Sequence, residues 1–183
     1  QAKAKQTAQR LWGRNGAAHA NHPYLLAKGI TAADIISQIK QSHYQGQHNL
    51  LIPVRQNNEI VSMQFIGPDG GKRFLAGGAL RGSHTFVGDP GQMANGVVLA
   101  EGFATAASIY QATGLPVVVT FNAGNLPIVA EKLAQTLPAD IAVTIAADND
   151  VSGPGIQKAQ EAAAFLGERA CVVMPQFSAE QIE

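Results

Sequence analysis

Three acidic residues follow apolar segments of the chain and could together bind a divalent cation. The apolar run over residues 97–100 is followed by Glu101, and the apolar run over residues 141–147 is followed by Asp148 and Asp150. Both runs are short and rich in small or β-branched residues, which predicts buried strands. Ligands of an open parallel sheet bind beyond the carboxyl ends of its strands, so we expect the three carboxylates to meet there. Because neighbouring carboxylates repel one another unless a cation neutralises them, the pattern predicts a divalent metal site.

The second half of the chain supplies the elements that would position these acids. Strands are predicted over residues 97–100, 117–121, 141–147 and 170–174, and helices over residues 103–113, 126–137 and about 152–167. This alternation predicts a parallel sheet with right-handed crossovers and helices on both faces. The first strand is followed by neither G-x-G-x-x-G nor a Walker A loop, which excludes the usual dinucleotide and P-loop sites.

The first half predicts a smaller unit of helices and antiparallel strands. A helix interrupted near Gly13 and Gly16 is expected over residues 1–20 and another helix over residues 31–40. A polar loop is expected over residues 41–49, and strands over residues 50–54, 60–66 and 72–75. The glycine-rich loop over residues 77–82 has two interpretations, a phosphate-binding loop served by Lys72, Arg73 and Arg81 or an ordinary connector. Residues 88–96 resemble a linker, so the domains are predicted to be 1–92 and 93–183.

Composition limits the class of protein. With 183 residues, 46% of them hydrophobic, and 13 basic against 13 acidic residues, the chain is typical of a globular protein without a strongly basic overall charge. The single cysteine excludes an internal disulfide and a cysteine-rich zinc site. His19 and His22 have ligand spacing but no third ligand nearby, so a metal role there is disfavoured. We expect a cytoplasmic protein without a membrane segment, and the start at Gln1 suggests a piece of a longer chain.

Longer segments of the sequence resemble a known family. VVLAEGFATAASI, FNAGNL and IAADNDVSGPGIQKA are similar to the Toprim domain, and most to its form in plasmid conjugative primases and phage primase-helicases. Upstream, PYLLAKGI, LLIPV and VSMQFIGPDGGKRFLAGG resemble the amino-terminal part of a DnaG-type primase core. The resemblance implies an α/β fold, in which a Toprim-like parallel sheet flanked by helices follows a smaller α+β primase-type subdomain.

The resemblance also implies roles for individual residues. Glu101, Asp148 and Asp150 match the catalytic and metal-binding acids of the family, which hold one or two Mg²⁺ or Mn²⁺ ions. Lys72 resembles a basic residue that primases direct at nucleotide or template, and Arg73 and Arg81 would neutralise the same phosphates. From the loop after the second Toprim strand, Asn122 and Asn125 are expected to contact substrate. One position departs from the DnaG pattern, because Ala104 stands where those primases usually have a further acid.

The implied activity is metal-dependent nucleotidyl transfer, the synthesis of RNA primers on a single-stranded DNA template from ribonucleoside triphosphates. Further expected partners are a helicase or other domains of the parent protein. Two alternatives stay open, a Toprim nuclease that hydrolyses phosphodiesters and a non-catalytic module that binds nucleic acid or a protein partner. A topoisomerase is disfavoured, because no context marks Tyr24, Tyr44 or Tyr110 as a nucleophile.

Overall fold

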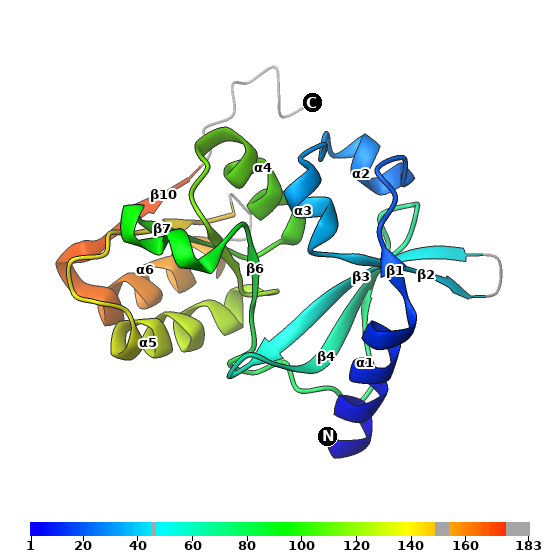
Figure 1. The fold of residues 1–183 in the computed structure, drawn as a ribbon. Helices are drawn as coiled ribbons and strands as arrows, with labels where there is room; N and C mark the ends of the chain where they lie inside the picture. Colours follow the sequence, from blue (N-terminus) through cyan, green and yellow to red (C-terminus); the bar gives the residue numbers. More distant parts are fainter. Residues whose placement is uncertain (45–46, 149–153, 175–183) are drawn as a thin grey trace.

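Two five-stranded sheets form the centre of the computed structural model, which describes residues 1–44, 47–148 and 154–174 (Figure 1). The first sheet is antiparallel, and its spatial order follows the chain: β1 (Gly16–Ala17), β2 (Lys40–Tyr44), β3 (Gln47–Gln56), β4 (Glu59–Ile66) and β5 (Lys72–Phe74). The strands expected around residues 50–54, 60–66 and 72–75 are confirmed. The loop expected over residues 41–49 is wrong, since β2 and β3 pair there through their backbones despite polar side chains.

Helices cover both faces of the first sheet. On one face lies α1 (Ala2–Arg14), whose buried Ala4 and Ala8 are four residues apart and therefore share one side of the helix. The other face is covered by the short helices α2 (Pro23–Ala27) and α3 (Ala33–Ser37). The helix expected over residues 31–40 is shorter than predicted, because the chain leaves α3 at Gln38 and enters β2 at Lys40.

The second sheet has the order β10-β9-β7-β8-β6, and the neighbouring strands β9 and β7 precede the predicted acids. Four strands are parallel, which confirms the predicted class: β7 (Val97–Ala100), β8 (Val117–Val119), β9 (Val143–Ala146) and β10 (Ala170–Val173). The fifth, β6 (Thr85–Val87), pairs antiparallel with β8 at the edge. Because β6 belongs to this sheet, the boundary predicted after residue 92 falls inside the second unit; the linker over residues 88–96 instead contains η1 (Pro90–Asn95).

The helices of the second sheet lie on its two faces, as the alternation predicted. One face packs against α4 (Phe103–Thr113), and the other packs against α5 (Leu126–Thr136) and α6 (Pro154–Leu166). Short 3₁₀ turns, η2 (Ala123–Asn125) and η3 (Gly167–Arg169), precede α5 and β10. Among the described residues, no helix has the length and apolar content needed to cross a bilayer.

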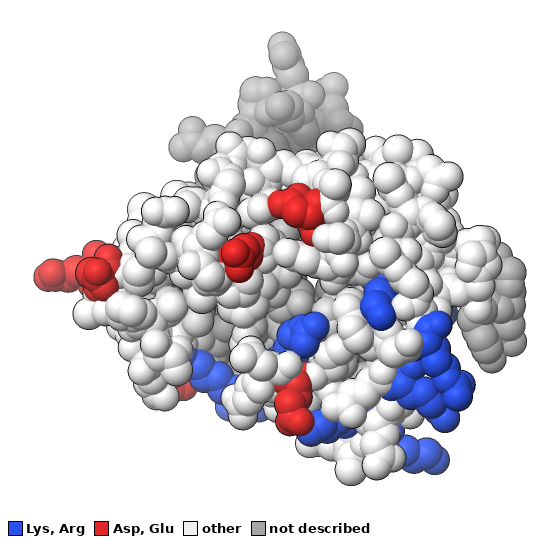
Figure 2. Space-filling view, in the orientation of Figure 1, with Lys and Arg blue, Asp and Glu red and all other residues white. Residues whose placement is uncertain are grey.

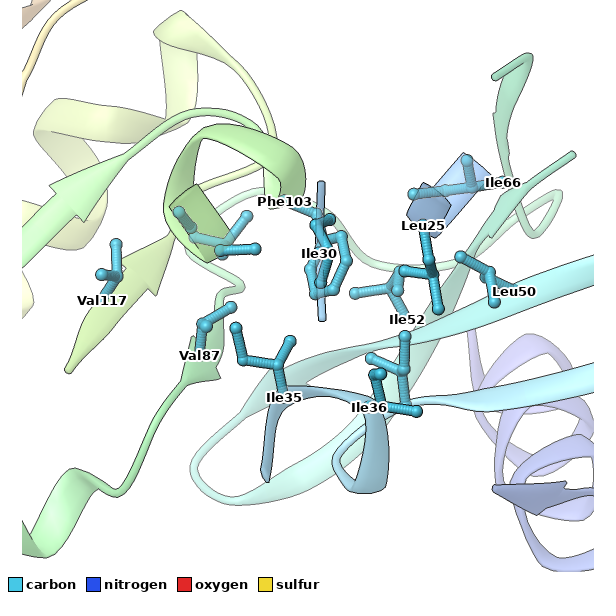
Figure 3. Packing of buried hydrophobic residues seen from close by; sticks show 14 of the residues in the cluster. Leu25, Ile30, Ile35, Ile36, Leu50, Ile52, Ile66, Val87, Phe103 and Val117 are labelled. Carbon is cyan, nitrogen blue, oxygen red and sulfur yellow. The ribbon is translucent and has the colours of Figure 1, made fainter. Parts of the chain in front are cut away.

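One cluster of buried hydrophobic residues includes members from both sheets and joins them. Figure 3 shows Leu25, Ile30 and Ile52 of the first half meeting Phe103 of α4, with Val87 and Val117 of the second sheet beyond them. The α4 side of this junction also has polar contacts. The Gln111 side chain accepts hydrogen bonds from the backbone of Thr31 and Ala32 (2.8 and 3.0 Å) and donates one to Gly29 O (3.0 Å). The orientation of the two sheets is therefore set by shared packing and by specific hydrogen bonds.

Candidate metal and nucleotide site

Glu101 and Asp148 lie at the carboxyl ends of two neighbouring parallel strands. β7 and β9 pair with Ala100 opposite Ala146, so Glu101 follows its paired strand end directly and Asp148 follows its own after one residue, Ala147. Both residues are half-buried, and the Oε1 atom of Glu101 is inaccessible to solvent. Two of the three predicted acids therefore come to one edge of the sheet, while Asp150 lies outside the described residues.

The start of α6 packs against both acids at Gly155. A Cβ atom built on Gly155 would lie 2.8 Å from the carbonyl oxygen of Asp148 and 3.6 Å from Oε1 of Glu101. No side chain fits at the shorter distance, so the glycine allows the start of α6 to pack closely against Asp148 and Glu101. The sequence predicts only that Gly155 lies at the start of a helix. Its close packing against Glu101 cannot be predicted, because it depends on a contact with a segment far away in the chain.

The donor set at this edge fits a divalent cation. Mg²⁺ and Mn²⁺ prefer carboxylate and carbonyl oxygens, and Mg²⁺ usually keeps several waters beside one or two carboxylates. Glu101 and Asp148 offer such oxygens at neighbouring strand ends. Within residues 1–44, 47–148 and 154–174, no group of three or more His, Cys, Asp and Glu side chains could hold a metal ion. The described part thus supplies two predicted ligands, and Asp150 stays the predicted third.

Phe121 connects the acidic edge to the first sheet. Its backbone N–H donates to the carbonyl oxygen of Glu101 (2.8 Å), and its ring meets the ring of Phe74 edge-on, with 5.8 Å between centroids. Phe121 adopts φ +72°, a left-handed conformation that is unfavourable for a bulky residue. The backbone is therefore strained at Phe121, where the segment after β8 contacts both Glu101 and β5.

Arg81, Asn122 and Asn125 line one small concavity of about 220 Å³ beside the loop after β8. Arg81 and Asn122 are exposed, and the Asn122 Oδ1 atom accepts a hydrogen bond from the Asn125 backbone (2.9 Å). Asn125 differs, because its side chain is only 3% exposed and all of its polar atoms bond to backbone groups. The substrate contact predicted for Asn125 disagrees with this geometry, which gives it a structural role instead.

Lys72 and Arg73 line a different concavity, of about 530 Å³, with His48 and Asn49 of β3 and the carboxylate-bearing Asp69. Both basic side chains are exposed, and the Arg73 guanidinium lies 5.4 Å from the centroid of the Phe65 ring. The five predicted binding residues therefore form two groups on two surfaces, a division that sequence spacing alone does not reveal.

A third concavity, which we call the Trp12 cleft, lies where α1, the β3–β4 hairpin and β6 meet. It has a volume of about 640 Å³, and Trp12, Pro53, Arg55, Phe86 and Met93 are among the residues that line it. Arg55 is the charged residue among those that line the Trp12 cleft, and burial lowers the pKa of its guanidinium. The structure leaves Trp12 half-buried at this cleft.

His84 lies behind Arg55 at the junction of the two sheets. The backbones of the two residues exchange hydrogen bonds of 2.8 and 3.0 Å, and the His84 ring contacts Phe86 edge-on. Burial lowers the pKa of His84, and the positive charges of Lys132 and Arg55 lower it further. The imidazole is therefore held neutral beside two cations.

The zero net charge conceals a strong separation between the two halves. Residues 1–92 contain ten of the 13 Lys and Arg but four of the 13 Asp and Glu, so their formal charge is +6, and that of residues 93–183 is −6. Figure 2 shows Lys and Arg gathered mainly over α1 and the adjoining strands of the first sheet. An acidic half, which contains the predicted metal ligands, thus lies against a basic half, and this arrangement suits the binding of a polyanion.

Comparison with known proteins agrees with this arrangement. Residues 96–180 match the family model described as a Toprim domain. The chain is also 35% identical over 158 residues to "DNA primase TraC" of Escherichia coli, and 35% identical over 157 residues to a second protein of that name and organism. These matches cover 81% of this chain but only 14% and 10% of the two relatives. The chain therefore spans a small part of the length of the relatives it matches.

Proposed function

Residues 96–180 of this chain belong to the Toprim family, and from that premise we propose that it is the catalytic core of a DNA primase. The proposed reaction is metal-dependent nucleotidyl transfer, which joins ribonucleotides into a primer on single-stranded DNA. The observation that carries the proposal is the meeting of Glu101 and Asp148 at adjacent strand ends, with the start of α6 packed against both at Gly155. The relatives named DNA primase support the choice of reaction, since they match most of the chain.

In this proposal, Glu101, Asp148 and Asp150 bind Mg²⁺ or Mn²⁺ through their carboxylates. When bound, the ion would supply positive charge that neutralises nucleotide phosphates and favours ionisation of an attacking hydroxyl. The chain itself contributes positioning and charge neutralisation, which are the main requirements of phosphoryl transfer. Arg81 and Asn122 face the triphosphate from the loop side, and Lys72 and Arg73 neutralise the phosphates of nucleotide or template.

The Trp12 cleft is the proposed contact surface for the single-stranded template. Aromatic side chains on which bases stack, combined with cations for the backbone, are typical of surfaces that bind single strands. Trp12 and Phe86 provide the rings, and Arg55 and Lys40 provide the cations, with the Lys40 ammonium 4.8 Å from the Trp12 ring centroid. The charge of +6 on residues 1–92 would attract the same ligand over a longer range.

A primer-synthesis assay tests the catalytic proposal. The protein is incubated with labelled single-stranded DNA, ribonucleoside triphosphates and Mg²⁺ or Mn²⁺, with and without an annealed primer, and the products are separated on a denaturing gel. We expect new or extended products that disappear in Asp148→Asn and persist in Asp140→Asn, which changes an exposed acid away from the site. Shortened DNA would overturn the proposal in favour of a nuclease. Unchanged DNA would overturn it in favour of a binding module.

Fluorescence tests the template surface separately, because Trp12 is the one tryptophan of the chain. Titration with an oligodeoxythymidine strand should quench its emission, and Arg55→Ala should weaken binding by about 3- to 30-fold. The matched control Arg169→Ala removes a cation of the second half and should leave the affinity unchanged. Binding without any change in Trp12 emission would place the strand elsewhere.

A further inference from the structure

Asn125 connects three backbone segments from a buried position. Its Oδ1 atom accepts a hydrogen bond from the Gly82 N–H (2.6 Å), and its Nδ2 atom donates to the carbonyl oxygens of Ser83 (2.7 Å) and Thr120 (2.8 Å). Gly82 ends the glycine-rich loop and Ser83 follows it, and Thr120 follows the last residue of β8. One side chain thus fastens the loop to the strand end.

That strand end is the one that also touches the acidic edge. The Thr120 N–H donates to the carbonyl oxygen of Ala100 (2.9 Å), and the next residue, Phe121, donates to that of Glu101 (2.8 Å). A series of hydrogen bonds therefore connects the glycine-rich loop, through the Asn125 side chain and the segment after β8, to Glu101.

Two further side chains hold the same loop. Lys132 of α5 donates from Nζ to the Gly82 carbonyl oxygen (2.9 Å), and Gln56 of β3 donates from Nε2 to the Arg81 carbonyl oxygen (2.8 Å). Gly82 has φ +69°, which favours glycine, and a Cβ atom there would lie 2.6 Å from Lys132 Nζ and would displace that ammonium. The backbone around Arg81 is fixed from three directions.

The loop presents one charged side chain as a result. Gly82 has no side chain, and Ser83 is buried with its hydroxyl bonded to the Ala79 carbonyl oxygen (3.3 Å), but Arg81 is exposed. Arg81 and Asn122 share the concavity next to η2, and η2 packs against α6, the helix that begins at the two acids. The fixed loop therefore places the exposed Arg81 beside the loop after β8, at the same carboxyl edge of the sheet as Glu101 and Asp148.

We propose that Asn125 is a positioning residue that fixes Arg81 relative to Glu101, so that the guanidinium meets the phosphates of a metal-bound nucleoside triphosphate. Arg is suited to this role because its planar fork donates two parallel hydrogen bonds to phosphate, but only when it is correctly oriented. The inference rests on the proposed function, since it takes a nucleoside triphosphate as the ligand of the acidic edge.

Nucleotide affinity tests the proposal directly. Binding of ATP with Mn²⁺ is measured by calorimetry, and Mn²⁺ alone is titrated in parallel. Arg81→Ala should weaken ATP binding by about tenfold. Asn125→Ala should weaken it to a similar extent, and the double variant should lose little more than either single variant, since both changes remove the same contact. Affinity for Mn²⁺ alone should stay at the wild-type value in all three, and Asn95→Ala, an exposed asparagine, serves as control.

A separate variant guards against loss of folding. Circular dichroism checks each protein, and Lys132→Met loosens the loop while leaving Asn125 in place; it should also weaken ATP binding. Wild-type affinity in Asn125→Ala or Lys132→Met, or additive losses in the double variant, would overturn the positioning role. Failure of the wild-type protein to bind Mn²⁺ and ATP would instead overturn the proposed function, so the two failures are distinguishable.

Discussion

The backbone N–H of Phe121 donates a 2.8 Å hydrogen bond to the carbonyl oxygen of Glu101 from a left-handed conformation. The same residue places its ring against Phe74 of the first sheet. The position of the acidic edge thus depends on a strained residue that touches both sheets. Strain of this kind persists only where surrounding contacts offset it, and here the ring contact and the hydrogen bond do so.

Two substitutions at Phe121 separate the strain from the ring contact. Phe121→Ala and Phe121→Gly both lose the ring, but only glycine adopts φ +72° without strain. We therefore expect Phe121→Gly to be more stable than Phe121→Ala by about 1 kcal/mol. Urea unfolding measures the difference. Equal stability of the two variants would contradict a strained backbone at this position.

Gly155→Ala should have an effect opposite in sign to the usual one in a helix. Replacing glycine by alanine within a helix normally stabilises by about 0.5–1 kcal/mol. At Gly155 the new methyl would lie 2.8 Å from the Asp148 carbonyl oxygen, so we expect a loss of stability of about 1 kcal/mol or more and weaker Mn²⁺ binding. Gly13→Ala in α1 is the matched control, since nothing lies within 4 Å of its Cβ position. A stabilised Gly155→Ala protein would show that α6 does not press on the acids.

Stability should fall in mild acid because of His84. Burial and two neighbouring cations lower its pKa from the ordinary 6.5, so the unfolded chain takes up a proton that the folded chain does not. The contribution of neutral His84 is complete above pH 6.5 and is lost as the pH falls from there toward the lower pKa of the folded chain. His84→Gln should therefore lose less stability than wild type between about pH 7.5 and about pH 5.5 in urea unfolding. The exposed His43→Gln should behave like wild type, and an unchanged slope in His84→Gln would refute the assignment.

Gln111 should matter more to stability than its exposed position suggests. Gln111→Ala removes three hydrogen bonds to backbone atoms of residues 29–32, and we expect a cost of about 1–2 kcal/mol. Gln135→Ala, an exposed glutamine of α5, should change the free energy of unfolding by less than about 0.5 kcal/mol. Comparison of the thermal midpoints of the two variants measures this difference. Equal midpoints would show that solvent replaces the Gln111 contacts.

The fold was predictable where burial determines the sequence. The β7 run is apolar throughout, and the β9 run is apolar except for Thr144, because α4 covers one face of the sheet and α5 and α6 cover the other; their strands are as expected. β2 was not predictable, since residues 40–44 are mostly polar and their backbone pairing with β3 leaves no apolar pattern in the sequence. β6 is only three residues long, and its membership in the second sheet depends on pairing with β8 about 30 residues later.

The site was predictable in its acids but not in its neighbours. Glu101 and Asp148 follow obvious strands, and the parallel register brings the strand ends together. The roles of Asn125 and Gly155 depend on partners far along the chain, which side-chain type and local spacing do not identify. For the same reason, sequence placed Lys72 and Arg73 together with Arg81, although the two groups line different surfaces.

Mn²⁺ binding tests the central claim most directly, because it requires neither template nor partner domains. Calorimetric titration of the wild-type protein should show saturable binding, and Glu101→Gln and Asp148→Asn should each weaken it by about tenfold or more. Asp140→Asn should retain the wild-type affinity, since it removes one acid of the same half without touching the strand ends. Loss of binding confined to the two strand-end variants is the result we predict. Equal affinity in all four proteins would contradict a metal site at Glu101 and Asp148.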